Sequence, residues 1–127
     1  MDLGELRRYC LSKPGAKESY PFGPGALVMK VGGKLFAIIA DEADPLTISL
    51  KSEPDIAIML RSHFPAVEPG YHLNKKHWNT VTLDGTIPKK EIREWIDDSY
   101  DLVVDKLPRT TKDELSKKAS PNRRSRR

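Results

Sequence analysis

The sequence predicts an α+β fold: an antiparallel sheet of about five strands, with an N-terminal helix, a middle helix and a long C-terminal helix packed on one face. Short apolar segments joined by glycine-containing turns are typical of hairpins. Three other segments carry apolar residues three and four positions apart, which is the spacing of an amphipathic helix. Strands that follow one another through short turns favour an antiparallel sheet. A chain of 127 residues has the size of one domain.

The strand signals differ along the chain. Segments 26–31 and 35–40 are apolar and flank a Gly-Gly-Lys sequence, whose glycines supply the positive φ of a tight hairpin turn. Segment 46–51 alternates apolar and polar residues strictly, as a half-buried strand does. An edge strand is expected before a Phe-Gly-Pro-Gly turn, and a loop is expected over residues 66–76. The expected strands are 18–22, 26–31, 35–40, 46–51 and 77–83.

The three helices have recognisable ends. The first begins with acidic residues and stops at a Lys-Pro-Gly sequence, with Cys10 on its apolar side. In the middle helix Ser52 is the expected N-cap, ahead of Pro54 in the first turn. The last helix has Pro88 near its start and ends at Pro108. The expected helices are residues 2–13, 52–64 and 87–107.

Alternation along strand 77–83 predicts which side chains share a face of the sheet. With Val81 facing the core, Trp78 and Thr80 lie on the opposite, wetter face. The polar residues of the alternating strand 46–51 are expected on that same face. The sequence therefore predicts a polar sheet face with one aromatic residue. The alternative is that a loop covers Trp78, because tryptophan is usually largely buried.

Positive charge is concentrated near the C-terminus. The net charge is +4, but residues 109–127 carry eight Lys or Arg against two acidic residues, and the rest of the chain carries 14 basic against 16 acidic residues. We therefore expect residues 1–107 to form one near-neutral domain and residues 108–127 to form a basic, disordered tail. Such a tail is either an electrostatic arm for phosphate groups or a solubilising extension.

The densest group of polar and aromatic side chains lies in residues 71–78. Two lysines offer charges for phosphates, Tyr71 and Trp78 offer aromatic faces for stacking, and His72 and Asn74 offer hydrogen-bonding groups. The alternative is that the lysines are only solvated turn residues. The candidate nucleic-acid-binding residues are Lys51, Tyr71, His72, Asn74, Lys75, Lys76, His77 and Trp78.

Other chemistries have little support in the sequence. The three histidines lack a metal-binding spacing, and Cys10 on an apolar stripe is expected to be a core residue. No glycine-rich phosphate loop occurs, so a nucleotide cofactor has no support. Taken together, these observations predict no cofactor, no metal, no catalytic residue and no enzymatic activity. No apolar run is long enough for a membrane span, and the start lacks a secretory signal pattern. A single cysteine suits a reducing cytoplasm.

Four stretches match a known family pattern. The longest is His-Leu-Asn-Lys-Lys-His-Trp-Asn-Thr-Val at residues 72–81, followed by Leu-Asp-Gly and a proline. The others are Tyr-Cys-Leu with Lys-Pro-Gly near the start, Lys-Leu-Phe-Ala at residues 34–37, and Ser-Leu-Lys at residues 49–51. Together they resemble the MmcQ/YjbR family of small bacterial proteins. The resemblance covers about residues 1–107 and leaves the basic tail outside.

This resemblance implies a compact fold similar to CyaY-like and secretion-chaperone-like proteins. It also implies DNA binding through a double-wing arrangement, with matching positions at Lys51, His72, Asn74, Lys75, His77 and Trp78. The leading hypothesis is therefore a cytoplasmic, monomeric, weakly sequence-specific DNA-binding protein that contacts phosphates through lysines and the basic tail. One alternative is a protein- or peptide-binding module that uses the same sheet face. Another is a small-molecule site around His72 and His77.

Overall fold

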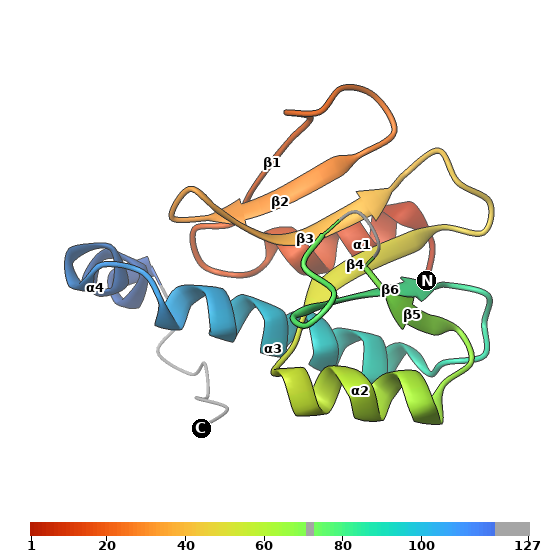
Figure 1. Cartoon of the computed structure of the whole chain (residues 1–127). Helices are drawn as coiled ribbons and strands as arrows, with labels where there is room; N and C mark the ends of the chain where they lie inside the picture. The colour runs from red at the N-terminus through yellow and green to blue at the C-terminus, as the bar shows by residue number, and fades with distance from the viewer. Residues whose placement is uncertain (71–72, 119–127) are drawn as a thin grey trace.

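The computed structural model describes residues 1–70 and 73–118. The strands are β1 (Lys17–Ser19), β2 (Leu27–Val31), β3 (Lys34–Ala40), β4 (Thr47–Lys51), β5 (Val67–Pro69) and β6 (Trp78–Thr82). The helices are α1 (Leu3–Leu11), α2 (Pro54–His63), α3 (Lys89–Asp105) and α4 (Arg109–Lys118). Neighbouring strands pair antiparallel in one sheet of order β1-β2-β3-β4-β6-β5 (Figure 1). The predicted α+β fold with an antiparallel sheet is confirmed.

The sheet has one more strand in the described residues than the sequence predicted. Strand β5 lies inside the segment 66–76 that was expected to be a loop, and it pairs with β6 at the edge of the sheet. It has three residues and ends in Pro69, so it shows no alternation that a sequence pattern could reveal. A proline is tolerated there because an edge strand does not use all its amides in the ladder.

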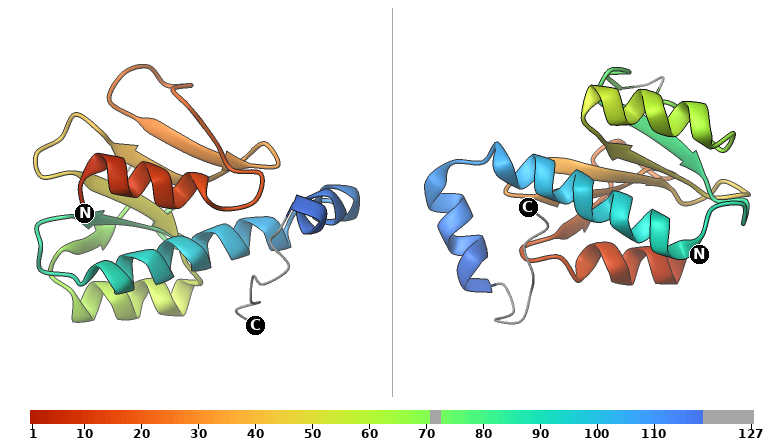
Figure 2. Two further views of the ribbon diagram at one scale, coloured as in Figure 1. Left: turned by 180° about the vertical axis from the view of Figure 1, so that it is seen from behind. Right: turned by 90° about the horizontal axis from the view of Figure 1, so that it is seen from below.

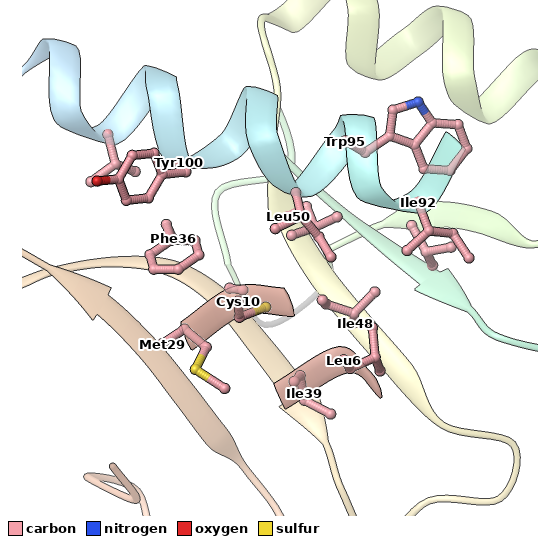
Figure 3. Packing of buried hydrophobic residues seen from close by; sticks show 14 of the residues in the cluster. Leu6, Cys10, Met29, Phe36, Ile39, Ile48, Leu50, Ile92, Trp95 and Tyr100 are labelled. Carbon is pink, nitrogen blue, oxygen red and sulfur yellow. The ribbon is translucent and has the colours of Figure 1, made fainter. Parts of the chain in front are cut away.

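The hydrophobic core lies between the sheet and the helices. Helices α1 and α3 lie side by side behind the sheet in the view of Figure 1 and face the viewer in the left panel of Figure 2. Helix α2 lies beside β5 and β6. In the core, Phe36 on β3 meets Tyr100 on α3 edge to face, with ring centroids 5.3 Å apart (Figure 3). Cys10 is buried in the same cluster, which confirms its prediction as a core residue.

Two helix starts differ from the prediction. The N-cap of α2 is Glu53 and not Ser52, and no side chain caps this end. The Ser52 amide instead donates to the His77 carbonyl at 2.7 Å, which ties the start of α2 to the chain entering β6. Helix α3 begins at Lys89, with Pro88 at its N-cap. Proline is therefore the first residue of α2 and the N-cap of α3, two positions where an amide proton has no partner within the helix.

A buried serine joins α3 to the sheet. Strands β3 and β4 pair as far as Ala37 and Leu50, so Phe36 and Lys51 come next in the register. At that point the Ser99 hydroxyl accepts a hydrogen bond from the Lys51 amide at 2.9 Å and donates one to the Phe36 carbonyl at 2.6 Å. One side chain thus satisfies a backbone donor and a backbone acceptor where the ladder stops.

The prediction of a disordered tail from residue 108 is wrong for its first part, because residues 109–118 form α4. Residues 119–127 lie outside the described residues. Leu115 is buried against the turn after α1, where a Cβ on Gly15 would come within 2.4 Å of its Cδ2 atom. One leucine among polar residues gave no helical pattern in the sequence. Like the other helices of the described ranges, α4 lacks the length and apolar character needed to span a membrane.

Candidate functional site

One face of the sheet points away from α1 and α3, and we call it the open face. The register of β4 and β6 pairs Lys51 with Trp78, Ser49 with Thr80, and Thr47 with Thr82. Val81 is buried in the core, so these three pairs lie on the opposite side by alternation. The predicted sharing of one face by the polar residues of these two strands is confirmed. The Ser49 and Thr80 hydroxyl oxygens are 2.8 Å apart and hydrogen-bonded.

The open face contains a cavity of about 460 Å³, which we call the trough. Its floor comes from β3, β4 and β6 and includes Ile38, Ser49 and Thr80. Phe22 lines one side from the β1–β2 loop, and Leu73 lines the other from the β5–β6 loop. These loops flank the front of the sheet in Figure 1. The trough is a concave site between two loops, lined largely by apolar and small residues.

Trp78 lies on the open face but is only 9% exposed. A Cβ on Gly70 would lie 3.0 Å from the Trp78 Cβ, and the Gly70 amide donates to the Trp78 carbonyl at 2.8 Å. The chain after β5 therefore packs closely along Trp78. The structure supports the alternative that a loop covers this residue, and the predicted wetter position is wrong. We remove Trp78 from the surface that can stack on a ligand.

The predicted lysine pair lies on an ordered turn. The Asn74 side-chain oxygen accepts from the Lys76 amide at 3.0 Å, and the Asn74 carbonyl accepts from the amides of His77 and Trp78 at 3.0 and 2.9 Å. Asn74 thus folds the turn, which is a structural use of its side chain. The side chains of Lys75 and Lys76 are exposed on this turn.

The remaining predicted residues occupy different positions. Lys51 is half-buried at the end of β4, opposite Trp78. His77 is half-buried, and its carbonyl accepts from the Ser52 amide. Tyr71 and His72 lie outside the described residues, so the small-molecule site expected around His72 and His77 lies partly outside them. The structure gathers Lys51, the lysine turn and Trp78 at one end of the open face.

An exposed aromatic residue was missed by the sequence analysis. Phe22 is 71% exposed at the side of the trough. Its loop is tied to the end of β3, because the Tyr20 hydroxyl donates to the Asp41 carboxylate. This contact raises the pKa of Tyr20 above its usual value, since the phenol is held in its donating, neutral form. The sequence predicted Phe22 as the last residue of an edge strand over 18–22, whereas β1 ends at Ser19 and Phe22 lies in the loop that follows.

A buried polar residue on the core-facing side of β6 was not among the predicted site residues. Asn79 is 1% exposed, and its amide nitrogen donates to the Ala57 carbonyl of α2 at 3.1 Å. Its side-chain oxygen accepts from Arg61 at 2.8 Å, and Arg61 also contacts the Lys75 carbonyl at 3.4 Å. This network links α2, β6 and the lysine turn. It holds the turn beside the sheet, which is a positioning role.

The charges on the open face are uneven. By strand alternation, the open face carries three lysines, Lys17, Lys30 and Lys51. It also carries Glu68, on the edge strand β5. Negative charge lies at the other side of the trough, where the Glu42 carboxylate would be 3.2 Å from a Cβ on Gly25. Positive charge therefore marks the end of the open face that carries the lysine turn.

Cys10 has the properties of an inert thiol. Burial raises the pKa of the Cys10 thiol from 9.0 to about 12, and nearby Lys13 only partly opposes this. We expect the folded protein to resist iodoacetamide at pH 8 and to react within minutes in urea, because only the thiolate is nucleophilic. Mass spectrometry of the alkylated chain measures both states. Rapid alkylation under native conditions would show that the thiol is accessible and would contradict its burial.

No group of three metal-ligating side chains occurs among residues 1–70 and 73–118. The candidate site is the open face with its lysine turn. Its residues can hold charged oxygen atoms at the turn and a flat or apolar group in the trough.

Known proteins share both sequence and fold with this chain. The YjbR family model matches residues 11–102. The chain is 41% identical over 108 residues to the "uncharacterized protein YjbR" of Escherichia coli strain K12, covering 85% of this chain and 92% of that protein. It is 39% identical over 101 residues to the "uncharacterized protein YbdF" of Escherichia coli O157:H7, covering 80% and 83% of the two chains.

Solved structures agree with these matches. The crystal structure of Deinococcus radiodurans protein DR2400 has a TM-score of 0.86 at 40% identity, covering 91% of this chain and 88% of that one. A crystal structure from Pseudomonas syringae has a TM-score of 0.69 at 30% identity, covering 80% of this chain and 98% of that one. The family match spans most of the sequence and the fold is shared. The chain therefore belongs to the YjbR family.

Proposed function

We propose that this chain is a non-enzymatic nucleic-acid-binding protein that contacts phosphates with Lys75 and Lys76. The observation that carries this proposal is the exposed lysine pair on a turn folded by Asn74. An ordered turn holds two charges in place at low entropic cost, which favours phosphate contact over a merely solvated charge run. Because phosphates carry no base information, such contacts give weak sequence specificity.

The distribution of acidic residues supports an approach from the open face. Helix α3, which packs on the opposite side of the sheet, carries Asp98 and Asp105 at exposed positions. Glu94 and Asp101 of the same helix are half-buried. Even with its basic residues Lys89, Lys90 and Arg93, α3 has a net negative charge, so it is a less favourable approach for a polyanion than the lysine turn.

The test is a salt titration of oligonucleotide binding by fluorescence anisotropy, with the full chain and a Lys75→Ala/Lys76→Ala variant. Loss of two phosphate contacts should flatten the plot of log Kd against log salt by roughly 1.4 to 1.8 units. A matched variant, Lys90→Ala/Lys106→Ala, removes two exposed lysines from α3 and its C-cap and should leave the slope unchanged.

Equal effects of the two variants would show that only total charge matters, and the proposed contact would be wrong. The alternative of a polypeptide partner gives a different result. Peptide binding through apolar burial would survive a few hundred millimolar salt, whereas phosphate binding would weaken by orders of magnitude.

A further inference from the structure

We propose that the trough is a nucleobase site, so that the nucleic acid bound at the lysine turn is single-stranded. This inference rests on the proposed function and names the form of its ligand. The trough has a volume of about 460 Å³, within the range of about 300–1,000 Å³ typical of small-molecule sites. The bases of a duplex are stacked and paired, so only an unpaired base can enter a concave site of this kind.

The sides of the trough are suited to a flat ring. Phe22 lines one side and is 71% exposed, so its ring can offer a face for stacking. Gly25, Ala26 and Ala40 also line the site, and none of them has a side chain long enough to fill it. On the other side, Gly70 lines the site and has no side chain to extend into it. The site thus has a stacking face and open space beside it.

The floor of the trough supplies hydrogen-bonding groups for the edge of a base. The Ser49 and Thr80 hydroxyls bond to each other at 2.8 Å, and each can form further hydrogen bonds. In the pair one hydroxyl donates to the other, so the accepting hydroxyl keeps its own proton for a ligand. An aliphatic side chain of a peptide would leave this capacity unused, and a base edge would use it.

The charges around the trough orient the strand. The Glu42 carboxylate lies at the Gly25 side, where a phosphate would be repelled. The β5–β6 loop supplies Leu73 to the other side and continues into the lysine turn. A base against Phe22 therefore directs its backbone away from Glu42 and toward Lys75 and Lys76, beyond Glu68 on β5.

The experiment compares a labelled 12-nucleotide single strand with the same sequence as a duplex, at one salt concentration. We expect the single strand to bind the full chain at least tenfold more tightly. Phe22→Ala should weaken single-strand binding roughly 5- to 100-fold, because it removes one stacked base contact, and should leave duplex binding unchanged. Ala40→Leu, which fills the trough, should act in the same way. Ile58→Ala removes an exposed apolar side chain from α2 and is the matched control with no effect.

A strand with abasic sites tests the same contact without relying on a variant. It keeps its phosphates and lacks the base, so wild-type affinity for it should fall as far as Phe22→Ala lowers affinity for the normal strand. With the abasic strand, Phe22→Ala should have no further effect.

Equal binding of single strand, abasic strand and duplex would overturn the base site. If the three ligands bind equally but Lys75→Ala/Lys76→Ala still flattens the salt dependence, the phosphate contact is supported and only the base site is wrong. Absence of binding to every oligonucleotide would refute both.

Discussion

Phe36→Ala is expected to lower the free energy of unfolding by about 3–5 kcal/mol, the usual cost of removing a buried aromatic ring. Phe36 is fully buried on β3 and packs edge to face on Tyr100, with ring centroids 5.3 Å apart. The substitution removes this contact and leaves a cavity between β3 and α3, which a close-packed interior fills only in part. Urea unfolding followed by circular dichroism measures the change.

The matched control for this prediction is Phe22→Ala. It makes the same chemical change at an exposed loop position, and we expect it to stay within about 0.5 kcal/mol of the wild type. The contrast separates the loss of a buried ring from the loss of any phenylalanine. Similar unfolding midpoints for the two variants would mean that Phe36 is not a core residue. The control also shows whether the Phe22→Ala protein used in binding experiments is folded.

Ser99→Ala is expected to lower the free energy of unfolding by about 1–3 kcal/mol, although it removes a single oxygen atom. The hydroxyl bonds both the Lys51 amide and the Phe36 carbonyl, and the residue is fully buried. Removing it leaves a donor and an acceptor without this partner in a place that water does not reach. A hydrogen-exchange measurement should show faster exchange of the Lys51 amide in the variant than in the wild type.

The control for Ser99→Ala is Ser116→Ala on α4, where the side chain is exposed. Alanine has the higher helix propensity, so this second change should be neutral or slightly stabilising. Unchanged stability of Ser99→Ala, or unchanged exchange at Lys51, would show that the hydroxyl does not hold the end of the ladder.

The sequence predicted that the polar residues of two strands share the open face, but not which of them are covered. The alternation of segment 46–51 and of Trp78, Thr80 and Thr82 was sufficient to place these polar residues on one face, and the structure adds that the two strands pair. The burial of Trp78 depends on the β5–β6 loop, and the exposure of Phe22 depends on how its own loop is held. Both depend on contacts between distant parts of the chain, and the alternation of residues along one strand cannot predict such contacts.

Elements with few apolar residues were also missed, for the same kind of reason. Helix α4 has one buried anchor, Leu115, and its position depends on the space left by a glycine far away in the sequence. Strand β5 has three residues, fewer than a pattern needs. The N-cap of α2 was assigned to Ser52 because serine is a favourable N-cap residue. In the structure the Ser52 amide donates to the His77 carbonyl, and Glu53 is the N-cap. Long-range contacts decided each of these cases.

The two outer strands of the sheet have a consequence for how any partner is recognised. Both β1 and β5 have three residues, and Pro69 ends β5 while exposed Lys17 begins β1. Short edges with a lysine or a proline resist the addition of a further strand. We therefore expect the proposed ligand to contact side chains of the open face and not to pair with an edge strand. If the trough is the proposed base site, single substitutions within it should change ligand preference and leave the sheet itself intact.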